Sequence, residues 1–164
     1  MALDKPKDAT PLKLRPMDPS RYPAFERYSI GEYAQSNIDS GRWPATDALQ
    51  KSKQAYRELL PEGLDTKDHS ILELIADELA VGVLWIHADR ESAIPSAYIY
   101  DIEIEAQYRG KGYGKQAMLA LERWCLQQGL KRIGLNVFAF NKAAIGLYES
   151  LGFQITNFQM KKDL

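Results

Sequence analysis

The sequence predicts an α+β fold in which a central mixed, mostly antiparallel sheet of about six to seven strands is flanked by about four helices. Three runs rich in Ile, Leu, Val and Tyr lie between residues 69 and 105, separated by short polar turns as in an antiparallel meander. Longer segments on both sides place apolar residues at helical spacing. We expect a single domain over residues 1–164 with the element order β-α-α-β-β-β-α-β-α-β, and leave one further closing strand open.

The N-terminal part of the chain predicts one short strand and two helices. Residues 1–10 are charged and interrupted by proline, and we expect a mobile tail there. Thr46 or Asp47 is the expected N-cap of the second helix, because either side chain can accept a hydrogen bond from a free helical N–H group. In chain order, the strand is predicted over residues 12–16, the first helix over 22–35 and the second from the cap to Leu60.

The rest of the chain alternates strands with amphipathic helices. In the first of these helices Met118, Leu121 and Cys125 follow helical spacing. Gly129 is suited to end that helix, and Asn141 is suited to cap the next. The predicted strands cover residues 69–75, 79–88, 96–105 and 132–140, the helices residues 115–128 and 141–150, and the closing strand or strands residues 153–161.

The overall composition excludes several classes of protein. Lys and Arg (21) nearly balance Asp and Glu (22), so there is no broad electrostatic footprint for nucleic acid. Cys125 is the single cysteine, which excludes an intrachain disulfide and a cysteine-based metal cluster, and we expect no metal site. No apolar run approaches the roughly 18 residues that span a bilayer, and no secretory signal is evident. We expect a cytoplasmic protein that uses neither membrane nor nucleic acid, and leave a homodimer open.

A basic, glycine-rich turn stands between the predicted strand over residues 96–105 and the helix that follows it. From Arg109 to Lys115 it reads RGKGYGK. Glycine lets the backbone approach a ligand closely, and the first N–H groups of a helix favour an anion. The turn therefore predicts a cradle for phosphate oxygens. Its spacing fits neither a dinucleotide fingerprint nor a P-loop, because Lys115 directly follows the third glycine and Gln116 stands where a P-loop has Ser or Thr.

Together with residues further along the chain, this turn resembles the GCN5-related N-acetyltransferase (GNAT) superfamily. The family's pyrophosphate loop reads Arg or Gln, two residues, Gly, one residue, Gly or Ala, and the segment that starts at Arg109 is similar to it. The second motif has an Asn early in the next helix, a Tyr seven residues later and then a Gly-Phe pair. Asn141, Tyr148 and Gly152-Phe153 match it. The close resemblance covers residues 96–153 and is greatest with small uncharacterised bacterial members.

The resemblance implies that acetyl-CoA is the donor, held where the strands over 98–105 and 132–140 splay apart. The pantetheine arm would bond to backbone groups near Ile102 and Ile104, and the N–H of Ile104 would stabilise a tetrahedral intermediate. Asn141 would cap its helix and contact the pantetheine arm. The pyrophosphate would lie on the backbone N–H groups of the turn, which comprises Arg109, Gly110, Lys111, Gly112, Tyr113, Gly114 and Lys115.

The resemblance assigns a general acid but leaves the general base open. In the family, the Tyr of the second motif protonates the leaving thiolate, and Tyr148 would take this role because a phenol of pKa about 10 keeps its proton at neutral pH. Some relatives carry a Glu twelve residues before that Tyr, but here the position is Asn136, which cannot act as a base. Asp101 and Glu103 remain as candidates for the base or an amine-binding group. Strand alternation separates these carboxylates from the tyrosines that precede them, unless a bulge changes the parity.

The sequence therefore predicts an acyltransferase that moves acetyl from acetyl-CoA to a primary amine by direct transfer in a ternary complex. Cys125 lies on an apolar helix face, which argues against an acetyl-enzyme intermediate. Two alternatives stay open: a catalytically silent acyl-CoA-binding or sensor module, and an acetyltransferase for a protein N-terminus or lysine. Intact Asn141 and Tyr148 favour an enzyme. The motifs identify neither the acceptor amine nor the range of acyl groups.

Overall fold

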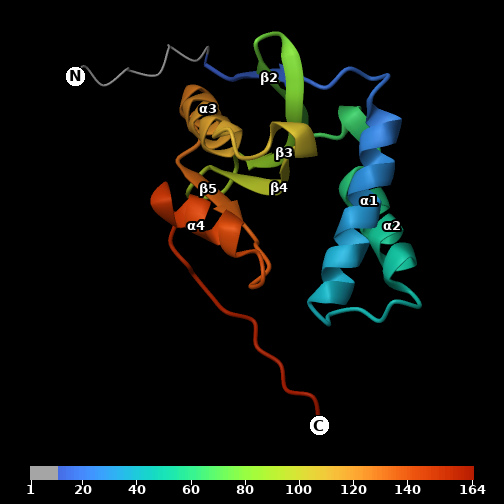
Figure 1. Cartoon of the computed structure of the whole chain (residues 1–164). Helices are drawn as coiled ribbons and strands as arrows, with labels where there is room; N and C mark the ends of the chain where they lie inside the picture. Colours follow the sequence, from blue (N-terminus) through green and yellow to red (C-terminus); the bar gives the residue numbers. More distant parts are fainter. Residues whose placement is uncertain (1–10) are drawn as a thin grey trace, which may run out of the picture.

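The computed structural model describes residues 11–164, so the tail expected over residues 1–10 lies outside the described part. Figure 1 shows the elements along the chain. The strands are β1 (Lys13–Pro16), β2 (His69–Ala76), β3 (Leu79–Asp89), β4 (Ser96–Ile104) and β5 (Arg132–Leu135). The helices are α1 (Tyr22–Asp39), α2 (Ala48–Leu59), α3 (Tyr113–Gln127) and α4 (Lys142–Ser150), with short 3-10 helices η1 (Gly63–Asp65) and η2 (Ala106–Tyr108). The predicted order of strands and α-helices is confirmed as far as α4.

The strands form one mixed sheet in the order β1-β2-β3-β4-β5. The first four strands are antiparallel neighbours, which confirms the meander predicted for β2, β3 and β4, whereas β4 and β5 are parallel. Asp77 and Glu78 connect β2 to β3 with φ angles of 47° and 65°, the backbone of a tight hairpin turn that follows the twist of the strands. A parallel pair needs a crossover connection instead, and α3 provides it between β4 and β5.

The expected count of six to seven strands is wrong for residues 11–164, which contain a sheet of five strands. The closing strand or strands predicted over 153–161 do not form, and this segment runs away from the sheet instead (Figure 1). The strand predicted over 132–140 ends at Leu135. A strand needs partners for its backbone N–H and C=O groups. The side chains after Phe153 are of types that are common in strands. The edge of β5, however, is only four residues long and is followed by a loop, so it is too short for a further strand to pair with.

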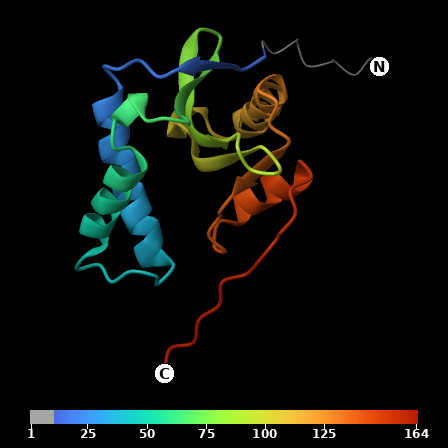
Figure 2. The ribbon, with the colours of Figure 1, turned by 180° about the vertical axis from the view of Figure 1, so that it is seen from behind.

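Helices cover both faces of the sheet, and the two faces differ in the side chains they bury. On one face α3 and α4 lie against an aliphatic core that includes the fully buried Leu84 and Met118. On the other face α1 and α2 lie side by side over a second cluster rich in aromatic residues, among them Tyr56 and Trp85. Figure 2 shows the same separation from behind. Strand β4 contributes side chains to both faces, so its alternation decides what each face contains.

Candidate active site

A β-bulge in β4 sets the positions of the predicted site residues. Trp85 of β3 pairs with Asp101, but the next residue, Ile86, pairs with Ile99, so Tyr100 is an extra residue opposite this step. Tyr100 stacks on Trp85 with ring centroids 4.7 Å apart. Asp101 accepts a 3.4 Å hydrogen bond from the hydroxyl of Ser29 in α1. Both residues therefore lie on the face that α1 and α2 cover.

The bulge overrides simple alternation, which is the exception that the sequence left open. Tyr98, Tyr100, Asp101 and Glu103 share the α1 face, whereas alternation alone separates the tyrosines from the carboxylates. The side chains of Ile102 and Ile104 pack on the aliphatic core of the opposite face. The bulge thus accommodates the extra residue Tyr100 and keeps the aromatic and acidic side chains on a single surface.

Strands β4 and β5 part in the middle of β4. They pair only where Ser96–Ile99 lies opposite Arg132–Leu135. Beyond this point a cavity of about 140 Å³ lies between the two chain segments and α4, and Asn136, Asn141 and Tyr148 line it. The structure therefore brings the Asn and the Tyr of the second motif to the place where the strands separate.

The backbone of β4 presents polar groups to this opening. The N–H of Glu105 donates to the carbonyl oxygen of Val81 in β3 at 2.9 Å. Because successive N–H groups of a strand alternate between its two edges, the N–H groups of Ile102 and Ile104 point to the opposite edge, away from β3. These two residues thus combine an apolar side chain in the core with polar backbone groups at the opening.

The glycine turn has the backbone of an anion cradle. Gly110 and Gly112 have φ angles of 73° and 81°, a conformation that costs other residues roughly 1–2 kcal/mol. Gly112 occupies the N-cap position of α3, so no side chain in the described chain caps the first N–H groups of this helix. These N–H groups and the positive end of the helix dipole favour a bound anion.

The basic side chains of the turn point in different directions. Arg109 turns back to β4, where its Nε donates to the carbonyl oxygen of Ile104 at 2.8 Å and its Nη2 to Oε1 of Glu103 at 2.9 Å. The ammonium of Lys111 lies 5.7 Å from the ring centroid of Tyr108. Lys115 is exposed in the first turn of α3. The guanidinium of Arg109 thus links the turn to the strand, while the two lysines stay at the surface.

Tyr148 projects from α4 into the opening. The start of this helix is fixed by Asn141, whose Oδ1 accepts a 3.2 Å hydrogen bond from the N–H of Ala144, and this confirms the predicted cap. The ring of Tyr148 is half-buried beside Phe153, with centroids 5.6 Å apart. Burial first, and the charge of Asp101 second, raise the pKa of its phenol above the usual value. The hydroxyl therefore holds its proton at neutral pH, as a proton donor must.

Asp101 has the properties of a proton acceptor. Burial first, and the neighbouring Glu103 second, raise the pKa of its carboxyl to about 7. A carboxyl in this range exchanges a proton readily at neutral pH. Its charge also contributes to the raised pKa of Tyr56, after burial of that phenol. Asp101 therefore lies among groups from α1, α2 and α4.

A second, larger cavity of about 550 Å³ lies on the α1 face of the sheet. Phe25 from α1 and Val83 from β3 give it apolar walls, and Glu103 and Glu105 give it acidic ones. Asp101 lines both this cavity and the 140 Å³ opening. Two reactants, one in each cavity, would meet at this residue.

Glu103 connects α1 to the glycine turn. Its Oε1 accepts hydrogen bonds from the hydroxyl of Tyr28 at 2.7 Å and from Arg109 at 2.9 Å. The bond to Glu103 first, and burial second, raise the pKa of Tyr28 to about 12. The wall of the larger cavity is therefore coupled to the turn through one carboxylate.

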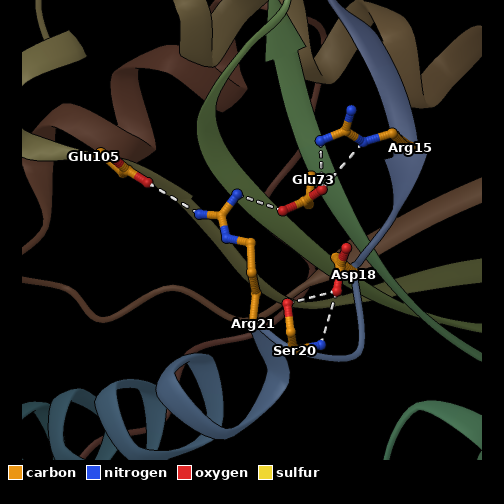
Figure 3. A network of polar contacts seen from close by, with 6 residues as sticks. All are labelled: Arg15, Asp18, Ser20, Arg21, Glu73 and Glu105. Carbon is orange, nitrogen blue, oxygen red and sulfur yellow. Dashed lines mark hydrogen bonds and ion pairs between the residues drawn. The ribbon is translucent and has the colours of Figure 1, made fainter.

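A second ionic network holds the start of α1 against the sheet, as Figure 3 shows. Glu73 of β2 is fully buried, and Arg15 of β1 donates to its Oε2 at 2.8 and 3.1 Å. Arg21, just before α1, donates to Oε1 of the same carboxylate, and its Nη2 lies 3.6 Å from Oε1 of Glu105. A buried charge is stable only with such partners. Because Arg21 and Glu105 line the larger cavity, the network fixes one end of it.

Several of these residues were not identified from the sequence. Ser29 and Tyr56 lie near Asp101, and Arg21 and Glu105 form part of the cavity wall. Their partners are distant along the chain; Arg21 and Glu73 are 52 positions apart, for example. The sequence feature that could have pointed to some of these residues is the high content of Tyr, Glu and Arg in the first predicted helix. It indicates a polar helix face but does not predict which residues that face contacts.

Other kinds of chemistry find little support in the described residues. Cys125 is buried in the aliphatic core, and burial first and Glu122 second raise the pKa of its thiol to about 11. A thiol in this state is a poor nucleophile at neutral pH. Across residues 11–164, no three His, Cys, Asp or Glu side chains are arranged to hold a metal ion. Within the same range, no helix has the length and apolar character of a membrane span.

The sequence of this chain is similar to a known protein family and to individual members of it. Residues 35–153 match the family model described as the acetyltransferase (GNAT) family. The chain is 40% identical to the uncharacterised N-acetyltransferase YycN of Bacillus subtilis (strain 168), over 93% of this chain and 99% of YycN. It is 34% identical to the uncharacterised N-acetyltransferase YdgE of the same strain, over 92% of this chain and 97% of YdgE. These relatives confirm the resemblance to small uncharacterised bacterial proteins.

Solved structures extend the agreement to the fold. The crystal structure of YycN superposes with a TM-score of 0.90 at 40% identity and covers 93% of this chain and 98% of its own. The aminoglycoside N-acetyltransferase AAC(6')-Iy, solved in complex with CoA, has a TM-score of 0.61 at 16% identity over 98% of both chains, which is a likeness of fold alone. With its motifs, its fold and these relatives, the chain belongs to the acetyltransferase (GNAT) family.

Proposed function

We propose that this protein transfers an acetyl group from acetyl-CoA to a primary amine, directly and within a ternary complex. The observation that carries this proposal is the position of Asp101, which lines both the opening beside Tyr148 and the larger cavity under α1. A proton acceptor and a proton donor therefore flank the point where two separately bound reactants would meet. This is the arrangement that an acyl transfer between a thioester and an amine requires.

The donor occupies the opening between β4 and β5. Its pyrophosphate binds the N–H groups of the glycine turn at the start of α3, where the helix dipole favours negative charge. Its pantetheine arm bonds to the backbone of Ile102 and Ile104 at the free edge of β4, and Asn141 contacts the same arm. AAC(6')-Iy, which shares the fold, has been solved with CoA and with the bisubstrate analogue CoA-S-monomethyl-acetylneamine, and this supports the same donor class here.

The reaction removes one proton from the attacking amine and delivers one proton to the leaving thiolate. The amine nitrogen attacks the thioester carbonyl carbon and gives up a proton to the carboxylate of Asp101. The N–H of Ile104 stabilises the oxyanion of the tetrahedral intermediate. The carbon–sulfur bond then breaks, and the hydroxyl of Tyr148 supplies a proton to the thiolate. The products are an acetylated amine and CoA, and proton exchange with solvent restores both side chains.

Two measurements test this function in sequence. Acetyl-CoA should raise the thermal unfolding midpoint of the full-length protein, whereas ATP and NAD should not. Release of free thiol should then depend on an added primary amine, and mass spectrometry should find the acetyl group on that amine. A shift without amine-dependent thiol release across a panel of small amines, N-terminal peptides and lysine peptides would instead indicate a silent acyl-CoA-binding module. Transfer to peptides alone would indicate a protein acetyltransferase.

A further inference from the structure

The cavity of about 550 Å³ on the α1 face has a charge pattern that discriminates between classes of amine. Three carboxylates line it, from Asp101, Glu103 and Glu105. Apolar side chains, among them Phe25 and Val83, line the same cavity. An occupant that satisfies this surface has positive charge at intervals and methylene groups in between.

The two arginines that line the same cavity do not reverse this pattern. Arg21 is held by the buried Glu73 and lies 3.6 Å from Glu105. Arg109 is held by Glu103 at 2.9 Å. Both guanidinium groups are therefore engaged with carboxylates of the protein, so a substrate carboxylate would have to compete with these partners. Among the lining side chains the three carboxylates still exceed the two arginines by one negative charge.

Glu103 retains an oxygen for a ligand. Tyr28 and Arg109 both donate to Oε1 of this carboxylate. Among residues 11–164, no hydrogen-bond donor contacts Oε2. A carboxylate has acceptor capacity for about four hydrogen bonds, and a bond from an ammonium group is among the stronger ones.

The spacing of the carboxylates gives a length. Asp101 and Glu103 lie beyond the bulge, where Trp85 and Val83 of β3 pair with them in regular register. Side chains on one face of a strand repeat every second residue, a step of about 7 Å. Two nitrogens, one bound at each carboxylate, would therefore be separated by roughly the length of a four-carbon chain.

We infer that the acceptor is a linear diamine, an inference that rests on the acetyl transfer proposed above. Its reacting nitrogen lies at Asp101, and its second nitrogen, as an ammonium, binds Oε2 of Glu103. The methylene groups lie along Phe25 and Val83. Glu103 is thus a specificity-determining residue, and a carboxylated amine of the same length is a poor acceptor because its negative charge meets the same wall.

The test compares acceptors of matched length. Diaminobutane, butylamine and γ-aminobutyrate are assayed with acetyl-CoA by thiol release and by mass spectrometry of the products. We expect kcat/KM for diaminobutane to exceed that for butylamine by about tenfold or more, the effect of one charged hydrogen bond. γ-Aminobutyrate should fall below butylamine. Equal or better use of the two single amines would overturn the inference while leaving acetyl transfer established. Absence of transfer to every amine tested would remove the proposed function itself.

Variants of Glu103 separate its charge from its structural contacts. Glu103→Gln keeps an oxygen for Tyr28 and Arg109 but removes the negative charge, so the preference for diaminobutane over butylamine should fall to about one. Glu91→Gln, in the exposed loop before β4, removes a charge elsewhere and should retain the preference. Glu103→Asp keeps the charge on a shorter side chain, which should move the preference toward diaminopentane. An unchanged preference in both Glu103 variants would assign the residue a structural role only.

Discussion

The two sides of β4 are built from different parts of the polypeptide. The proposed donor side, which comprises the opening to β5 and the turn over residues 109–115, relies on backbone N–H groups, two glycines of positive φ and the start of α3. The proposed acceptor side, which is the cavity under α1, relies on side chains held by hydrogen bonds and ion pairs across the chain. Backbone sites follow from a short local motif, whereas side-chain sites follow from tertiary contacts. Asp101 and Tyr148 lie where the two sides meet.

The largest effect is expected from Asp101→Asn, which removes the proposed base from the boundary between the two sides. General-base catalysis contributes typically about 10²–10⁴-fold, so turnover should fall by this amount. In the parent protein kcat/KM should rise as the pH increases through about 7, because the carboxyl accepts a proton only above its pKa. The variant should lack this rise.

The pH profile should be measured with an amine of low pKa, so that deprotonation of the substrate does not produce the same limb. Thermal unfolding and acetyl-CoA binding serve as controls for folding. Parent-like turnover in Asp101→Asn would move the base to another group.

Tyr148→Phe comes next and tests the same boundary from the donor side. Turnover should fall by about 10²-fold, because the thiolate loses its proton donor. Acetyl-CoA affinity should hardly change, since the ring and its contact with Phe153 remain. Isothermal titration and steady-state kinetics measure the two effects. Tyr22→Phe, which removes a hydroxyl bonded to Glu26, is the matched control with parent-like turnover. Full activity in the Tyr148 variant at neutral pH would remove this residue from the acid role.

Arg21→Ala tests how far the acceptor side depends on its ion pairs. The change leaves the buried Glu73 with Arg15 alone, and loss of one hydrogen bond to a charged group costs about 2 kcal/mol of unfolding free energy. Lys13→Ala breaks an exposed pair with Glu78 at 3.9 Å and should cost less than about 0.5 kcal/mol. Urea denaturation of both variants gives the comparison. Equal losses would mean that the buried network adds no stability beyond a surface pair.

Gly112→Ala gives the smallest effect and tests the donor side. The φ of 81° at this position costs a residue with a side chain roughly 1–2 kcal/mol of conformational free energy. Without a ligand, the turn of the variant should therefore relax to another conformation. Binding must then restore the original conformation of the turn, and this cost should lower the affinity for acetyl-CoA by about tenfold. Gly146→Ala, inside α4 and with open space around the added methyl, is the control and should bind as the parent does. Unchanged affinity in Gly112→Ala would exclude the turn as the main donor contact.

The two sides also differ in how much of them the sequence predicts. The glycine turn and the pair Asn141 and Tyr148 form local patterns on one strand-helix unit and one helix. The structure places Asn141 and Tyr148 at the opening between β4 and β5, and the turn at the start of α3. The same regularity predicts the meander and the α-helices. Prediction is weakest where partners are distant, as for Tyr28 and Glu103, which are 75 positions apart.

The missing closing strands have a related cause. Residues 153–161 have side chains suited to a strand, but a strand also needs a neighbouring edge. The sequence does not show that β5 is limited to Arg132–Leu135. In the same way, the face of β4 that carries Asp101 and Glu103 depends on the bulge at Tyr100, and no local sequence pattern predicts this bulge.

The bulge at Tyr100 shifts the alternation of side chains along β4 by one residue, and the composition of both faces of the sheet depends on this shift. A strand of the same length without the bulge would turn Asp101 and Glu103 toward the aliphatic core, and Ile102 and Ile104 toward α1. Deletion of Tyr100, by contrast, would keep all four residues on their present faces and remove the ring that stacks on Trp85. Substitutions on the α1 face, by contrast, change individual contacts and leave the backbone edge of β4 as it is. Point substitutions can therefore change the contacts of the α1 face one at a time, whereas loss of the bulge at constant strand length would remove Asp101 and Glu103 from that face together.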